Sequence, residues 1–141
     1  NKEARAKMAE ASVIAGLAFT LPKTTSSHAC SFPLTNLFHI PHGEACGLTL
    51  DYFARVNADA EPKDGRIHKF AQELGFKDMY DMADAIADLK KDLGLRTDLK
   101  EFSLTDEQVA ELVKTSHHPN MLNNPVEITD EILNKMYQSM R

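Results

Sequence analysis

The sequence predicts an all-α fold, a bundle of six or seven helices. Apolar residues recur at intervals of three to four positions through most of the chain, which is the period of an amphipathic helix. No stretch of strand length alternates apolar and polar residues, and no internal repeat is visible. The chain has 141 residues, 43% of them apolar, which is enough for one domain with its own hydrophobic core.

The first predicted helix covers residues 1–19. Small and apolar residues lie on one side of it, and most of the charged residues lie on the other. Because small side chains let another helix approach closely, we expect this helix to be buried in the bundle. Pro22 ends it.

Two helices are predicted next, over residues 28–38 and 43–57. The hydroxyl-bearing run 24–27 can cap the first of them. Pro33 lies inside that helix and predicts a kink or an irregular first turn. Pro41 then forces a break before the second helix, because a residue that precedes proline avoids the helical conformation.

Four more helices complete the prediction. We expect the fourth to have Pro62 in its first turn and to end at Gly75, and the fifth to cover residues 79–93. The sixth is predicted to open at Thr105, and the seventh to be capped by Thr129 and to run through Met140. The remaining signals are a capping-box pattern of Thr105 with Gln108, a connector over 98–103, and a turn-rich loop over 117–125.

Composition and charge exclude several classes of protein. The net charge of −5 and the pI near 5.6 lack the basic footprint of a nucleic-acid binder. No apolar run is long enough for a membrane span, since the longest one, residues 13–21, contains Gly16. Cys30 and Cys46 form no disulfide framework, so we expect a cytoplasmic protein. The first residue is Asn1, from which we expect the chain to be part of a longer one.

His28 and His42 are the residues most suggestive of chemistry. Imidazole is a common ligand of zinc and also suits iron. His28 lies near the start of one predicted helix and His42 near the start of the next, so a reversal at Pro41 can bring both to one metal ion. Two histidines that merely cap helices remain the alternative.

Three blocks of sequence resemble the C-terminal domain of iron-containing (group III) alcohol dehydrogenases. They are Ser27-His28-Ala29, Ile40-Pro41-His42-Gly43-Glu44-Ala45, and Asn124-Pro125 ahead of the final helix. The two histidines also stand fourteen residues apart, as in that family. The resemblance implies that residues 1–141 are the C-terminal helical domain of the dehydroquinate synthase-like, iron-alcohol dehydrogenase fold.

The resemblance also implies a metal site and a reaction. In the family, an Asp-x-x-x-His helix and two histidines, here His28 and His42, bind Fe²⁺ or Zn²⁺. The metal polarises the oxygen of an alcohol or aldehyde while hydride passes to or from NAD or NADP. Many members carry a histidine where this chain has Phe32, which we expect to form an apolar wall against the nicotinamide or the substrate. A plain core role for Phe32 is the alternative.

Two parts of the family's machinery are not found in this sequence. Both the Asp-x-x-x-His helix and the glycine-rich nucleotide-binding segment would lie upstream of Asn1. We therefore expect the isolated chain to be inactive, its partners to be the N-terminal nucleotide-binding domain and a small alcohol or aldehyde, and the enzyme to be a homo-oligomer. The alternative is a helical interaction domain without catalysis, whose histidines are caps.

Several further residues are candidates for a role at the site. Asp64 and His68 also fit Asp-x-x-x-His, but we expect a first-turn carboxylate and a surface histidine there. Glu44 could orient the metal ligand His42, or its carboxylate could simply stabilise the N-terminus of the helix. We expect His39 to face solvent and the loop with His117 and His118 to lie away from the chemistry, while Cys30 and Cys46 either flank the cleft or only pack. The segment from Ser31 to Thr35 is similar to a branch with phosphonoacetaldehyde reductase-like enzymes.

Overall fold

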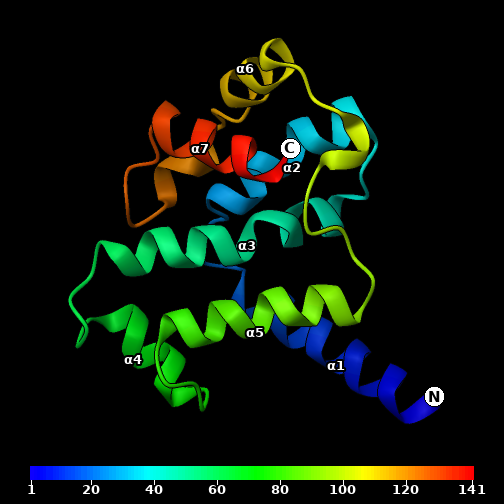
Figure 1. Ribbon diagram of the computed structural model, residues 1–141. Helices are drawn as coiled ribbons and strands as arrows, with labels where there is room; N and C mark the ends of the chain where they lie inside the picture. The colour runs from blue at the N-terminus through cyan, green and yellow to red at the C-terminus, as the bar shows by residue number, and fades with distance from the viewer.

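The computed structural model describes all residues, 1–141, and contains helices and no strand, which confirms the all-α prediction. Seven α-helices are joined by short loops, and two 3-10 helices lie between them (Figure 1). Their bounds are α1 Lys2–Ala18, α2 Ser26–Phe38, α3 His42–Asp59, α4 Arg66–Glu73, α5 Met79–Asp92, η1 Lys100–Phe102, α6 Asp106–Thr115, η2 Pro119–Asn123 and α7 Asp130–Met140.

The main core lies between α2, α3, α6 and α7. The largest fully buried side chains of this core include Leu34, Leu48, Leu112, Leu133 and Tyr137, one or more from each of these helices. The helix α5 packs against α3, and α4 packs on α5 with a smaller apolar cluster of Ala58, Ala71 and Met79 (Figure 1).

The reversal between α2 and α3 is the feature that positions the site. His39 ends α2 in the left-handed conformation, with φ of 56°. Pro41 follows after one residue, and His42 is the first residue of α3. Such a left-handed residue just beyond a helix, followed by a proline, stops the helix sharply. The chain turns back at this point, and contacts of His42 and Cys46 with His28 show that the first two turns of α3 lie beside the first turns of α2.

Side-chain caps explain where the last two helices begin. The Thr105 hydroxyl accepts the Gln108 N–H, and the Gln108 side chain accepts the Thr105 N–H, as the capping-box pattern predicts. The Thr129 hydroxyl accepts the N–H of Ile132 at the start of α7. Asn124 then ties the preceding loop to α3, because its amide donates to the Asn57 side chain at 2.7 Å.

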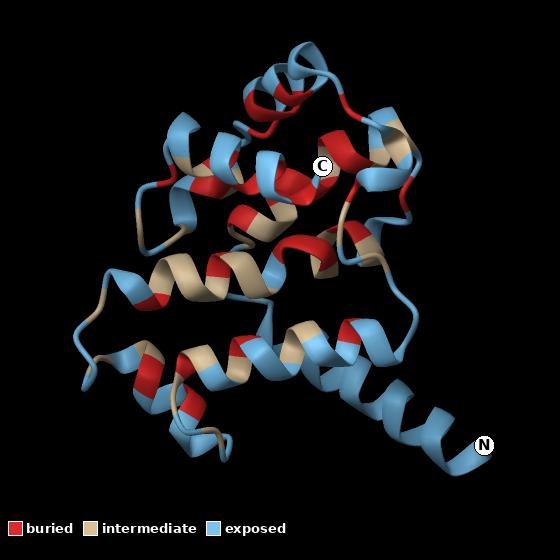
Figure 2. Ribbon diagram, in the orientation of Figure 1, coloured by how far each residue is buried: buried red, intermediate tan, exposed pale blue.

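The expected burial of the first helix is wrong for this chain. The α1 helix has no buried residue and extends beyond α5 (Figures 1 and 2). Its side chains of Met8, Val13, Ile14 and Leu17 are all more than half exposed. None of the small residues that predicted close packing is buried.

The start of the fourth helix is also later than predicted. Pro62 lies in a turn, where its carbonyl accepts the N–H of Gly65, and α4 begins only at Arg66. The Glu61 carboxylate then accepts the N–H of Ile67 and serves the first turn of the helix from outside it. None of the helices is both long and apolar enough to span a bilayer.

Candidate metal centre

The structure brings His28 and His42 together at the paired N-termini of α2 and α3. Their Nε2 atoms are 3.2 Å apart, and their rings meet edge to face with centroids separated by 4.6 Å. Two nitrogens that bind one tetrahedral zinc ion are separated by about 3.3 Å, given zinc–nitrogen bonds of about 2.0 Å. The pair therefore has the spacing of two ligands of one metal ion.

Cys46 provides a third donor atom that the sequence analysis did not single out as a ligand. It lies one helical turn after His42 on α3, and its Sγ is 3.9 Å from His42 Nε2 and 3.7 Å from His28 Nδ1. One donor atom from each of the three residues can be chosen so that all lie within 4.8 Å of one another. The spacing of His42 and Cys46, four residues apart on a helix, was the available signal.

The Ser31 hydroxyl links the backbone of His28 to the ring of His42. This buried hydroxyl donates to the His28 carbonyl at 2.6 Å and lies 3.3 Å from Nδ1 of His42. If His42 carries its proton on Nδ1, that N–H can donate to the Ser31 oxygen and leave Nε2 free as a metal ligand. The hydroxyl thus selects the tautomer that a metal site requires.

The charge state of His28 also suits a ligand. Partial burial lowers the pKa of His28, and the neighbouring His42 and His118 lower it further because a second positive charge nearby is unfavourable. The neutral imidazole, which is the form that binds metal ions, is therefore favoured. The donor set of two histidines and a cysteine fits a borderline ion such as Zn²⁺ or Fe²⁺.

Phe32 lies against both candidate ligands. Its ring stacks on that of His42 with a centroid distance of 5.9 Å and meets the ring of His28 edge to face at 5.5 Å. It also contacts His118, whose ring centroid is 4.6 Å away. Phe32 therefore gives the histidine pair an apolar neighbour.

The expectation that the loop with His118 lies away from the chemistry is wrong. The 3-10 helix η2 packs on α2, and His118, the residue just before η2, lies against Phe32. Asn120 donates its backbone N–H to Nδ1 of His118, which fixes the orientation of that ring. No local pattern signals this proximity, because it arises from the packing of distant segments.

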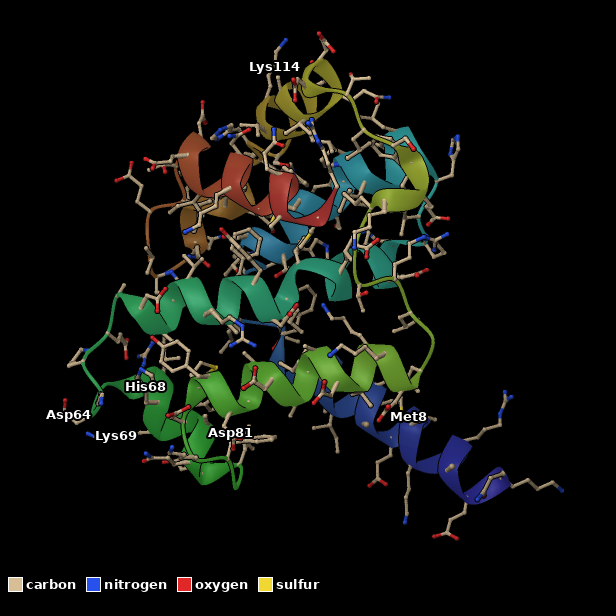
Figure 3. All side chains as sticks on the ribbon, in the orientation of Figure 1. Met8, Asp64, His68, Lys69, Asp81 and Lys114 are labelled. Carbon is tan, nitrogen blue, oxygen red and sulfur yellow. The ribbon has the colours of Figure 1, made fainter.

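The second Asp-x-x-x-His pattern does not form a site. Asp64 lies on the exposed loop before α4, whereas His68 is within the helix (Figure 3). His68 is buried, not on the surface as expected, and its ring nitrogens lie 3.4 Å from the Ala58 carbonyl and from the N–H of Met79. The ring links the last turn of α3 to the first residue of α5, and both of its nitrogens have a hydrogen-bond partner there.

The other candidates have structural partners. Glu44 receives two hydrogen bonds from Arg96, one from the backbone and one from the guanidinium group, so it anchors the chain after α5 and does not support His42. His39 is exposed, as expected. Cys30 is buried beside Tyr137 and Ser116 and only packs.

Comparisons with known proteins place the chain in a family. The model of the Fe-containing alcohol dehydrogenase family, C-terminal part, matches residues 1–140. A crystal structure of sulfoacetaldehyde reductase from Bifidobacterium kashiwanohense in complex with NAD⁺ is 66% identical to the chain, with a TM-score of 0.94. The similarity covers 99% of the chain and 37% of the chain in that crystal structure.

Two curated relatives extend the comparison. Alcohol dehydrogenase 4 of Saccharomyces cerevisiae is 27% identical over 98% of this chain, which spans only 38% of the yeast protein. Phosphonoacetaldehyde reductase of Streptomyces viridochromogenes is 43% identical over 38% of this chain and 14% of its own length. The match of the family model over nearly all residues is decisive: the chain belongs to the Fe-containing alcohol dehydrogenase family.

Proposed function

We propose that this chain supplies the metal ligands His28 and His42 to a metal-dependent, NAD(P)-linked oxidoreductase that interconverts an aldehyde and a primary alcohol. The observation that carries the proposal is the approach of the two Nε2 atoms to 3.2 Å at the paired helix N-termini. Membership of the Fe-containing alcohol dehydrogenase family supports the same reaction.

In the complete enzyme, the bound metal ion would polarise the carbonyl oxygen while NAD(P)H gives hydride to the carbonyl carbon and a proton completes the alcohol. The residues of this chain prepare that step. His28 and His42 bind the ion, and Ser31 holds the His42 ring with Nε2 available. Phe32 keeps water from one side of the histidine pair and offers an apolar surface to the nicotinamide.

Among aldehydes, a short one with an anionic end fits best. The 66% identical relative is a sulfoacetaldehyde reductase, and a 43% identical partial match is a phosphonoacetaldehyde reductase. Both names describe an aldehyde that carries a tetrahedral acid group on the neighbouring carbon. The proposed substrate is therefore such an aldehyde, reduced to the corresponding alcohol.

The competing function is a helical interaction domain in which His28 and His42 only cap their helices. The geometry speaks against capping, because neither α2 nor α3 has a side-chain hydrogen bond to its N-terminus. The two rings are instead directed at each other and at Cys46.

Metal content distinguishes the two functions. We expect the complete polypeptide, with its upstream segment, to hold about one metal ion per chain by elemental analysis, and His28→Ala or His42→Ala to weaken metal binding by at least roughly 100-fold. His39→Ala is the matched control, since this exposed histidine is in the same segment and should change nothing. Full metal content in both ligand variants would rule out the ligand assignment and leave the capping function.

A further inference from the structure

A cavity of about 500 Å³ opens beside His28, outside the cluster of metal donors. Three separate segments form its walls: the C-terminal end of α1 with the linker after it, the first turns of α2, and η2. The residues of the wall that matter here are Phe19, Lys23, Thr24, His28 and Asn120. The cavity therefore borders the candidate metal centre, because His28 belongs to both.

The electrostatic character of this cavity is positive. Lys23 is the one lysine or arginine among its lining residues, and no aspartate or glutamate lines it. The ammonium group of Lys23 takes part in none of the nine ion pairs of the molecule. Since no acidic side chain of the wall neutralises it, the charge of Lys23 is available to a ligand.

Thr24 and Asn120, which line the cavity with Lys23, can both donate hydrogen bonds. Thr24 Oγ1 accepts a hydrogen bond from the Asn120 side-chain amide at 2.6 Å, so the hydroxyl hydrogen of Thr24 is free to be donated. The Asn120 amide has a second N–H for the same purpose. Asn123 fixes the linker by donating to the Thr24 carbonyl at 3.0 Å.

A donor set of this kind suits an anion with several oxygens. An ammonium group, a hydroxyl and an amide N–H can each donate to one oxygen of a sulfonate or phosphonate, whereas they offer no negative charge to a cation. A purely apolar alcohol tail would gain no hydrogen bond or ion pair from any of the three groups. Phe19, on the same wall, can contact the methylene carbon that joins the two ends of such a substrate.

We propose that Lys23, Thr24 and Asn120 form the subsite that binds the anionic end of the aldehyde substrate. The proposal rests on the proposed function, because His28 must hold the metal that receives the carbonyl oxygen. It deepens that function by assigning substrate selectivity to the linker between α1 and α2. A short aldehyde is then held at both ends, with its carbonyl at the metal and its sulfonate or phosphonate at Lys23.

Substitution of Lys23 in the complete, metal-loaded enzyme tests the subsite. With sulfoacetaldehyde, we expect Lys23→Ala to raise KM roughly 10- to 100-fold with little change in kcat, as the loss of one charge-assisted contact predicts. With propanal, a neutral aldehyde of the same length, the same variant should keep its kcat/KM within about twofold. Lys23→Arg should restore most of the affinity, and Thr24→Val should show a smaller, equally selective loss.

Lys114→Ala is the matched control, because this exposed lysine lies on α6 at the end of the molecule opposite α1 (Figure 3). It removes the same charge and should leave both substrates unaffected. Inhibition by 2-hydroxyethanesulfonate and by 2-hydroxyethylphosphonate, each measured with the wild type and Lys23→Ala, shows which acid group the subsite prefers. Both compounds should inhibit Lys23→Ala more weakly than the wild type.

The possible failures of the two proposals are distinguishable. If the enzyme holds metal and reduces propanal but Lys23→Ala affects both aldehydes equally, or neither, the anion subsite is wrong and the proposed function stands. If the wild type holds no metal and reduces no aldehyde, the proposed function itself fails. Unchanged inhibition by both acids in Lys23→Ala would independently overturn the subsite.

Discussion

The two cysteines differ in their chemistry because they differ in burial. Cys30 is fully buried on α2, and this burial raises the pKa of its thiol to about 11, although hydrogen bonds with Tyr137 and Ser116 oppose the shift. Cys46 is only half-buried and lies beside His28 and His42. A thiol reacts as its thiolate. Cys30 is therefore protected from reaction both by its burial and by its raised pKa.

We predict that iodoacetamide at pH 8 labels Cys46 in the native protein and labels Cys30 only after unfolding. Mass spectrometry of the digested protein checks this, and Cys46→Ser should leave the native protein almost unlabelled. Zinc added beforehand should slow the labelling of Cys46, because its Sγ shares the donor cluster. Rapid labelling of Cys30 in the folded protein would contradict the prediction.

The raised pKa of Cys30 also determines how the stability of the folded protein changes with pH. The folded protein holds the thiol proton more tightly than the unfolded chain, whose thiol has its usual pKa near 9. The contribution of this group to stability is therefore complete below pH 9 and is lost as the pH rises from 9 toward 11.

At the residue scale, the sequence predicts the part of the site that is local and misses the part that depends on packing. The resemblance of the Pro41-His42-Gly43 block, and of its spacing from His28, to the family pattern is enough to propose the ligand pair. Cys46 could have been added from helical spacing alone. The positions of His118 and Asn120 could not be predicted, because they depend on η2 packing against α2 from a distant part of the chain.

The packing of α5 on α3 depends on a buried charge. The Lys90 side chain is only 6% exposed, and its Nζ donates to the Leu48 carbonyl at 3.0 Å and to the Asp51 carboxylate at 2.5 Å. A second ion pair, between Arg55 and Asp84, joins the same two helices at their surface. The two pairs differ in solvent exposure and so should differ in their effect on stability.

We predict that Asp51→Ala lowers the free energy of unfolding by roughly 3–5 kcal/mol, because it leaves the Lys90 ammonium buried without a negative charge to pair with. Lys90→Met should cost much less, since it removes the buried charge and keeps an apolar chain of similar length. Asp84→Ala is the control at the exposed pair and should cost less than about 1 kcal/mol. Urea unfolding followed by circular dichroism measures all three.

Equal losses for Asp51→Ala and Asp84→Ala would show that the Lys90 charge is hydrated in solution. The double variant Asp51→Ala/Lys90→Met gives a further check. If the cost of Asp51→Ala comes from the orphaned ammonium, removal of Lys90 should recover most of it.

At the scale of elements, local signals predict helix ends well where a side chain caps the helix within its own turn. Thr105 and Thr129 open α6 and α7 as expected. The start of α4 was missed because its first turn is served by Glu61, from the preceding loop. The packing partner of each helix was not predictable, since an amphipathic pattern shows which face is buried but not what covers it.

At the scale of the whole molecule, α1 is the helix that contributes no side chain to the hydrophobic core. It has 17 residues and no buried side chain, yet one side carries several large apolar residues. The chain spans 37% and 39% of two solved structures that match it over nearly all of its residues, so most of each of these relatives lies outside the matched part. We infer that the remainder of the protein covers α1 and thereby fixes the wall of the cavity formed by Gly16 and Phe19.

This inference predicts a difference between the isolated chain and the complete protein. A helix of this length without tertiary contacts is marginal in water, so the amides of α1 in the isolated chain should exchange with solvent far faster than those of α3 or α7. Brief proteolysis should cut between residues 2 and 25 and leave residues from about 26 to 141 resistant. In the complete protein, the same amides should be protected and the same cuts absent.

Self-association through the apolar side of α1 is a second test of the same inference. At high concentration the isolated chain should self-associate through this helix, which light scattering detects, and Ile14→Lys with Leu17→Lys should make it monomeric. Hydrogen exchange must therefore be measured at low concentration, where association cannot protect the helix. Slow exchange of α1 in the dilute isolated chain would mean that residues 26–141 stabilise it unaided, and that the cavity beside His28 forms without the rest of the enzyme.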